Sequence, residues 1–257
     1  MHPDPSNEAE RPAPILAMEG ISKAFGHVQA LDNVDFELRP NEILALVGDN
    51  GAGKSTLIKI LTGVYSADQG SILIDGNPVS IRNPRDAQAL GIAAVYQDLA
   101  LVDCRDIASN IFLGREPAFG FIVNKKKLVN DAENVLKQLK TNLSSATTTV
   151  GFLSGGQRQA VAIARALSRQ GRFIIMDEPT AALGVEEAQK VNSLILDLKA
   201  RGSSIIVISH NLVHVFSVAD RVFVLRQGKR VGTRQKCDTC MEEIVAMITG
   251  AQPADCD

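Results

Sequence analysis

The sequence predicts an α/β fold with a mostly parallel sheet, and three observations lead to it. Short continuous apolar runs indicate buried strands, segments with apolar residues at helical spacing separate some of these runs, and a glycine-rich loop stands between one such strand and a helix. The chain has 257 residues, 45% hydrophobic and 22% charged, which is enough for one large domain. We expect a single domain at 16–250, between a disordered tail at 1–15 and a second tail at 251–257.

Antiparallel strands are expected first along the chain. Prolines at positions 3, 5, 12 and 14 prevent regular structure in the N-terminal tail. Residues 15–38 contain short mixed runs with expected turns at Gly20 and Gly26, a pattern typical of antiparallel strands. This pattern predicts an N-terminal antiparallel β-subdomain that precedes the parallel sheet.

The later elements alternate between strand and helix. Strands are expected at 43–47, 71–76, 91–96, 173–176, 205–208 and 222–225. Helices are expected from residue 56, through most of a helical subdomain at about 98–160, and at 241–248, because their apolar residues recur at helical spacing. The strands at 173–176 and 205–208 flank a helical segment, which predicts a right-handed parallel crossover.

Composition and charge exclude several classes of protein. The net charge is −2, so no basic excess points to nucleic acid. No window holds the ~20 apolar residues of a membrane span, and the polar, proline-rich N-terminus lacks the regions of a signal peptide. The four cysteines are expected to be free thiols in a reducing cytosol, with zinc or redox use of the Cys237–Cys240 spacing as the alternative. We therefore expect a cytoplasmic chain that reaches a membrane only through a partner.

One glycine-rich segment carries the strongest chemical signal. It fits the phosphate-binding pattern G-x-x-x-x-G-K-[ST], and its residues are Gly48, Asp49, Asn50, Gly51, Ala52, Gly53, Lys54 and Ser55. The glycines let backbone N–H groups turn toward a phosphate chain, and the helix N-terminus adds positive partial charge. Lys54 can reach the β- and γ-phosphates, Ser55 can ligate Mg²⁺, and Thr56 follows at the helix start. The alternative is a glycine turn with an incidental lysine, but the strand–loop–helix context favours a P-loop NTPase core.

Polar residues follow several of the apolar strands, where the carboxyl ends of parallel strands line one edge of the sheet. These residues are Gly48, Gln97, Asp177, Glu178 and His210. Asp177 is expected to anchor Mg²⁺, and Glu178 to act as general base on the attacking water. His210 could contact the γ-phosphate, and Gln97 could hold water or Mg²⁺. A satisfied buried histidine is the alternative for His210. His214, one turn after His210, is expected to be structural.

A second glycine motif opens another helix. Its residues are Leu153, Ser154, Gly155, Gly156 and Gln157, followed by a helical stretch at 158–168. The domain would then carry two phosphate-seeking helix N-termini, and one sheet edge is unsuited to bring both to one nucleotide. A two-fold dimer, in which each chain's second motif closes the site of the other, resolves this.

Together these motifs resemble those of the ATP-binding-cassette (ABC) ATPases over residues 16–250. Residues 48–55 match the Walker A motif, residues 173–177 match Walker B, and residues 153–157 match the signature motif of that family. This resemblance implies the cassette fold, with a helical subdomain that carries the signature motif. It also implies ATP and Mg²⁺ as cofactors and a nucleotide-sandwich homodimer whose closure and hydrolysis drive a membrane permease.

The resemblance also extends to single residues. Glu178 matches the catalytic glutamate, Gln97 the Q-loop and His210 the switch histidine. Phe25 matches the position whose ring stacks on adenine. A coupling helix of the permease would dock beside the Q-loop, at 98–113.

Three shorter runs, at 95–102, 110–117 and 178–185, resemble the ATPases of bacterial fructose-, ribose- and xylose-type importers. This implies uptake of a simple sugar at the cytoplasmic face of the bacterial inner membrane, with a permease and an external sugar-binding protein as partners. Gly184 stands where many cassettes carry aspartate, as it often does in the sugar importers. The alternatives are a soluble cassette ATPase of translation, DNA or cluster assembly, a transporter of another small solute, and a non-hydrolysing module.

Overall fold

The fold is organised around a six-stranded sheet with the strand order β12-β11-β3-β10-β9-β6. The computed structural model describes residues 12–251, apart from 121, 140–142, 144 and 170. The strands are β3 (Ile43–Val47), β6 (Ile92–Val95), β9 (Phe173–Asp177), β10 (Ser204–Ile208), β11 (Arg221–Arg226) and β12 (Lys229–Gln235). All neighbouring strands are parallel except β11 and β12. The predicted mostly parallel sheet is therefore confirmed.

A second sheet is antiparallel and has the order β2-β1-β4-β5. Its strands are β1 (Leu16–Phe25), β2 (Val28–Leu38), β4 (Gln69–Ile74) and β5 (Asn77–Val79). The predicted turn at Gly26 is confirmed, but the one at Gly20 is wrong. Gly20 lies inside β1 with a φ of 61°, where the register with β2 shifts, and its N–H donates to Asp35. A β-bulge needs the same backbone freedom as a turn, so the glycine alone did not distinguish them.

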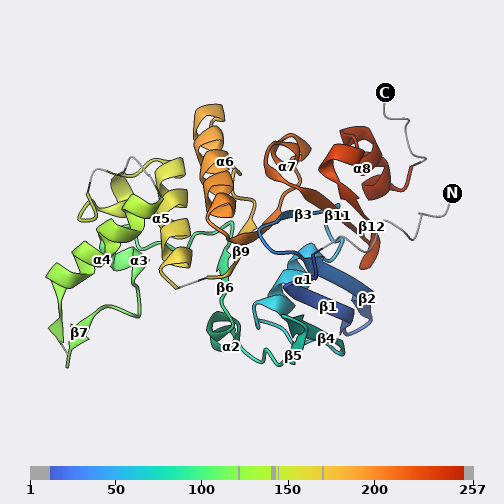
Figure 1. Cartoon of the computed structure of the whole chain (residues 1–257), viewed down its shortest axis with the longest axis horizontal. Helices are drawn as coiled ribbons and strands as arrows, with labels where there is room; N and C mark the ends of the chain where they lie inside the picture. Colours follow the sequence, from blue (N-terminus) through green and yellow to red (C-terminus); the bar gives the residue numbers. More distant parts are fainter. Residues whose placement is uncertain (1–11, 121, 140–142, 144, 170, 252–257) are drawn as a thin grey trace.

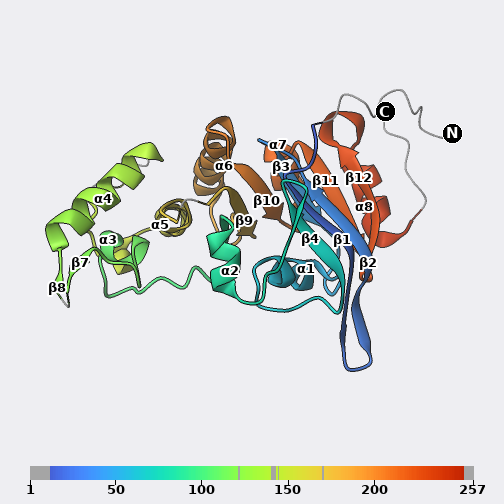
Figure 2. The same ribbon diagram turned by 60° about the horizontal axis from the view of Figure 1, so that its bottom comes forward.

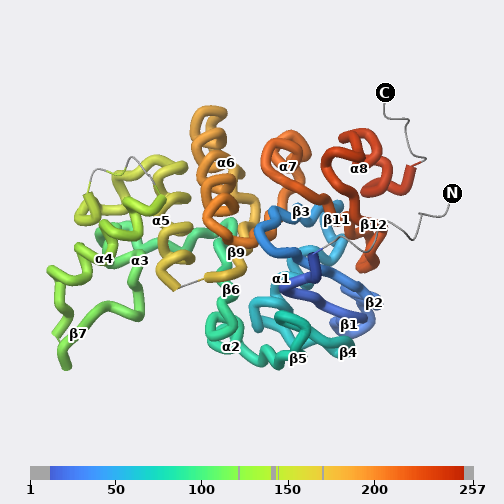
Figure 3. Tube along the Cα trace, viewed as in Figure 1, coloured from blue at the N-terminus to red at the C-terminus, as the bar shows by residue number. Residues whose placement is uncertain are grey.

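Helices cover the sheet and build one end of the molecule (Figure 1). They are α1 (Lys54–Leu61), α2 (Pro84–Ala89), α3 (Ile107–Ile111), α4 (Lys125–Gln138), α5 (Gly155–Leu167), α6 (Val185–Ala200), α7 (Leu212–Val218) and α8 (Met241–Thr249). Figure 3 follows the chain from β6 into the group of α3, α4 and α5 and back to β9.

The predicted helical region at 98–160 holds these helices and also a small hairpin, β7 (Ala118–Phe119) with β8 (Ile122–Val123). Gly120, at a φ of 60°, lies in the turn between the two strands. So short a run of apolar residues does not reveal its period, and the sequence did not predict it.

Alternate residues of the central sheet face two different cores. Ile43, Ala45 and Val47 of β3 pack with the group that includes α3 to α8, whereas Leu44 and Leu46 pack with β1, β2, β4 and α1. Because both faces are covered, β3 is apolar along its whole length and all five of its residues are buried. Packing on both faces therefore holds β3 in place, and β3 leads directly into the glycine loop.

Sequence reasoning also missed other elements, among them β5, β12 and α2. β12 is a polar edge strand that is exposed over its first three residues, so it lacks an apolar run. α2 carries a readable start signal, because Asn83 caps it and Pro84 occupies its first turn.

The expectation of free thiols is confirmed for Cys104 and Cys237 and wrong for Cys240, which is disulfide-bonded. Spacing along a chain does not show which thiols meet in space. Among the helices of the described residues, none is long and apolar enough to cross a membrane.

Candidate functional site

Four adjacent parallel strands end at one edge of the central sheet and deliver the predicted polar residues there. In sheet order, β3 leads to Gly48, β10 to His210, β9 to Asp177 and Glu178, and β6 to Gln97. Ile208 of β10 pairs with Asp177 of β9, so the ends of these two strands are in register. Gln97 is exposed two residues beyond the end of β6.

The glycine loop is held tightly against the sheet at its first residue. A Cβ on Gly48 would lie 2.2 Å from the carbonyl oxygen of Leu225, so only glycine fits there. Lys54 folds back over the loop, and its Nζ donates to the carbonyls of Gly48 at 2.7 Å and Asp49 at 2.9 Å. Burial lowers the pKa of Lys54, and Glu178, Asp49 and Asp177 oppose that effect. The ammonium is thus held by neutral carbonyl oxygens that an anionic oxygen could replace.

Asp177 ends β9 as a partly buried carboxylate. Burial raises its pKa, the neighbouring Glu178 adds to the rise, and Lys54 and Lys59 oppose it. Among the described residues, no group of three or more His, Cys, Asp or Glu side chains is arranged to hold a metal ion. The donors that could serve are Asp177, the exposed hydroxyl of Ser55 and the amide of Gln97. Such oxygen donors fit Mg²⁺, which commonly takes few protein ligands and completes its shell with phosphate and water.

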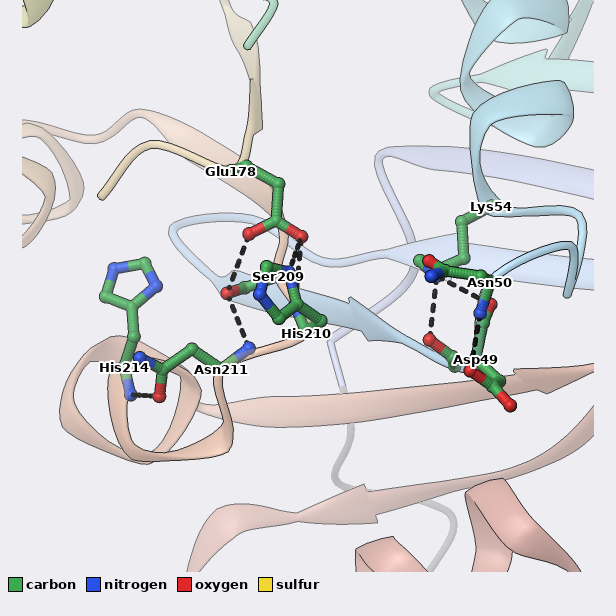
Figure 4. A network of polar contacts seen from close by, with 9 residues as sticks. Asp49, Asn50, Lys54, Glu178, Ser209, His210, Asn211 and His214 are labelled. Atoms are coloured by element: carbon green, nitrogen blue, oxygen red, sulfur yellow. Dashed lines mark hydrogen bonds and ion pairs between the residues drawn. The ribbon is translucent and has the colours of Figure 1, made fainter. Parts of the chain in front are cut away.

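The side chains of Glu178 and His210 contact each other in this structure (Figure 4). Oε1 of Glu178 lies 2.6 Å from Nδ1 of His210 and accepts a hydrogen bond from its backbone N–H at 3.0 Å. Oε2 accepts a longer bond, of 3.4 Å, from the hydroxyl of Ser209. Glu178 has a φ of 50°, which is uncommon for a non-glycine residue and turns its side chain back toward the start of α7. The side chain of Glu178 is only 14% exposed, whereas that of His210 is 73% exposed.

The second glycine motif lies on α5, away from the glycine loop (Figure 1). Ser154 caps the helix in a capping box, since Gln157 N–H donates to its hydroxyl and its own N–H donates to the Gln157 side chain. Glu187 of α6 lies beside the same helix start, where the Ser154 side chain and the Gly156 backbone lower the pKa of its carboxyl group. A carboxylate of the same chain therefore sits where this helix end would attract an anion.

Phe25 ends β1 at the tip of a hairpin that projects beyond the rest of its sheet (Figure 2). Phe25 is 42% exposed, and its ring packs edge-on against Tyr65, which lies four residues beyond the end of α1. An exposed aromatic face close to the helix that follows the glycine loop is suited to stack on a base.

Sequence reasoning missed Ser209, Tyr65 and Glu187. Ser209 could have been found from its place beside His210 after an apolar strand. Tyr65 contacts Phe25, and Glu187 lies beside the start of α5. Because these neighbours are distant in sequence, no local pattern predicted a role for either residue.

Comparisons with known proteins agree with these motifs. The profile of the family described as ABC transporter matches residues 31–181. The chain is 46% identical to the fructose import ATP-binding protein FrcA of Rhizobium meliloti, over 93% of this chain and 95% of that protein. It is 45% identical to the xylose/arabinose import ATP-binding protein XylG of Sulfolobus acidocaldarius, over 91% and 94%.

A solved structure of a nucleotide-free ATP-binding cassette from an ABC transporter is 27% identical and superposes with a TM-score of 0.81, over 93% of this chain and 96% of that one. The chain spans about half the length of several other curated relatives that it matches at 44% to 48% identity.

Proposed function

This chain belongs to the ABC transporter family, and on that premise we propose that it is the ATP-hydrolysing subunit of an importer for a simple sugar. The observation that carries the proposal is the sheet edge, where a phosphate-type loop, two carboxylates and a histidine end adjacent strands. The sugar comes from the relatives, because FrcA and XylG are matched over nearly their full lengths and are named for fructose and for xylose or arabinose import.

In the proposed reaction the chain's own groups bind and orient the nucleotide. The glycine-loop amides and Lys54 hold the phosphates, and Phe25 stacks on the base. Glu178 accepts the proton of the attacking water as the water oxygen bonds to the γ-phosphorus and the bond from that phosphorus to the β,γ-bridging oxygen breaks, which releases ADP and phosphate. His210 contacts the γ-phosphate. Bound Mg²⁺, held by Ser55, Asp177 and Gln97, would neutralise charge on the phosphate oxygens.

Two copies of the chain are proposed to complete the sites. Leu183 and Glu187 of the same chain lie next to Gly155 and Gly156, and α5 lies away from the glycine loop (Figure 1). A second copy that presents Ser154 and the start of α5 to the nucleotide would supply the missing anion contacts. The permease and a sugar-binding protein are the further partners, and the cytoplasmic face of the membrane is the proposed location.

The test uses Glu178→Gln, which keeps the shape of the side chain and removes the proton acceptor. The variant is loaded with ATP and Mg²⁺, recovered from detergent-solubilised native membranes and analysed by mass spectrometry. Glu186→Gln, an acid-to-amide change at an exposed position in the first turn of α6, is the matched control. We expect a multi-span permease to accompany the Glu178 variant and ATP hydrolysis to be lost only in that variant.

Uptake is then measured with the same permease and the wild-type chain, reconstituted together into vesicles, using fructose, ribose, xylose and arabinose. Recovery of soluble partners alone, such as ribosomal or cluster-assembly proteins, would refute the importer and leave the ATPase in place. ATP hydrolysis at the wild-type rate by Glu178→Gln would instead refute the assignment of the base.

A further inference from the structure

His214 is a buried histidine with unused hydrogen-bonding capacity. The residue is 5% exposed, and neither ring nitrogen has a hydrogen-bond partner within the part of the chain that the structure describes. Burying a polar group without a partner is costly, so such a group in a folded protein needs a reason. Burial lowers the pKa of His214, and the Glu178 carboxylate opposes that effect. The neutral ring has one N–H donor and one acceptor nitrogen.

The position of His214 ties it to the catalytic carboxylate. It lies in the first turn of α7, where its backbone N–H donates to the capping residue Asn211 at 3.2 Å. The Asn211 N–H donates to the Ser209 hydroxyl at 3.1 Å, and that hydroxyl donates to Glu178 Oε2. Figure 4 shows His214 and Glu178 at the two ends of this chain of contacts, with Asn211 and Ser209 between them. On the other side, α7 meets α6 through a neutral bond of 2.9 Å between Asn192 and Ser217, so Glu178 is the charged group that acts on His214.

The observed pairing of Glu178 with His210 engages one oxygen, Oε1, which lies 2.6 Å from Nδ1 of His210. We take this contact to open when Glu178 turns toward the attacking water in the proposed reaction. Glu178 would then lose the side-chain donor on Oε1 while its carboxylate is only 14% exposed. A poorly solvated carboxylate that loses a donor is destabilised unless another donor replaces it.

We infer that His214 is a positioning residue for Glu178. When Glu178 leaves His210, the unused ring N–H of His214 donates a hydrogen bond to the Glu178 carboxylate and so holds the base in place for hydrolysis. This inference rests on the proposed function. It gives a reason for two ring nitrogens that have no hydrogen-bond partner among the described residues, since their partner is engaged only during hydrolysis.

The test compares two replacements of His214. His214→Phe fills a similar volume without a donor, whereas His214→Gln keeps an N–H donor. We expect His214→Phe to lower kcat for ATP at least about tenfold, with KM and the melting temperature at or above the wild-type values. His214→Gln should keep kcat within about threefold of the wild type. Val213→Ala, at an exposed position on the same helix, is the matched control and should change nothing.

A second measurement separates positioning from packing. In the Glu178→Gln background, whose residual hydrolysis is followed in single-turnover reactions over long incubations, adding His214→Phe should cause no further loss of rate, because both changes remove the same interaction. His214→Leu replaces the phenylalanine variant if that variant does not fold, with the same expectations.

A wild-type kcat in His214→Phe would overturn the inference, as would equal losses in the glutamine and phenylalanine variants. Failure of the wild-type protein itself to hydrolyse ATP would refute the proposed function instead, and that result is visible before any variant is made.

Discussion

Replacing Arg221 by methionine should reveal how a buried charge pair links β2 and the turn before β3 to β11. Arg221 is 3% exposed and Glu42 is 6% exposed. Nε of Arg221 lies 3.3 Å from Oε1 of Glu42, and its Nη2 lies 3.2 Å from Oε1 of Glu37. Burial raises the pKa of Glu42 and lowers that of Arg221, so for both partners desolvation outweighs their attraction. The pair adds little net stability, but either partner alone would be stranded.

The size of the effect follows from what remains around Glu42 in the variant. Losing one partner of a buried pair costs about 3–5 kcal/mol. The Arg39 N–H still donates to Glu42 Oε2 at 2.8 Å, which favours the lower end. At about 2–4 °C per kcal/mol, a loss of about 3 kcal/mol lowers the melting temperature by about 6–12 °C.

The effect should also depend on pH, with a definite sign. The pKa of Glu42 in the folded chain is above its unfolded value, so its contribution to stability is present at low pH and lost as pH rises through the folded pKa. Without Arg221 that pKa rises further, because a cation that lowers it is gone. The deficit of Arg221→Met should therefore be larger at pH 8 than at pH 5.

Thermal unfolding followed by circular dichroism, at both pH values, measures this. Adding Glu42→Gln to Arg221→Met should restore much of the loss at pH 8, because no buried charge is then stranded. A variant that melts within about 2 °C of the wild type at both pH values would refute the reasoning, since that is less than the loss expected for about 1 kcal/mol.

Three further predictions concern the site. Asp177→Asn removes a carboxylate whose folded pKa is raised, so the nucleotide-free variant should melt above the wild type at pH 8, with the difference closing near pH 4, while ATP hydrolysis is lost; an unchanged melting curve at pH 8 would contradict this. Phe25→Ala should raise KM for ATP at least about fivefold, with kcat unchanged, since base stacking contributes at least ~1 kcal/mol; steady-state kinetics with ATP decide it. Glu187→Gln should lower the ATP concentration needed for dimerisation of Glu178→Gln, because its carboxylate competes with phosphate at the start of α5; light scattering against ATP concentration checks this.

The parts of the fold that the sequence predicted are those with local signals. β3 is apolar throughout because both of its faces are buried, and the glycine pattern after it has a fixed spacing, so strand, loop and helix are all readable. The polar residues at the sheet edge were likewise predictable, because parallel strands place their carboxyl ends together.

The rest depends on contacts between segments that are distant in sequence. The contact between Glu178 and His210 forms between residues that follow two different strands. It also depends on a positive φ at Glu178, which could not be predicted from a glutamate in the sequence. Glu187 meets the start of α5 only because α5 and α6 pack together. His214 has the residue type and spacing of an ordinary core histidine. It is distinguished by ring nitrogens that lack hydrogen-bond partners among residues 12–251 as far as the structure describes them.

The strand order at the site sets a fixed scale for the chemistry. Neighbouring strands lie about 4.8 Å apart, so the step from β3 through β10 and β9 to β6 covers about 14 Å. That length is set by backbone hydrogen bonds, and side chains at the strand ends can change without altering it. The backbone of the sheet therefore sets the distances between the glycine loop, His210, the two carboxylates and Gln97. Evolution can change the side chains at the strand ends without changing the spacing between those ends.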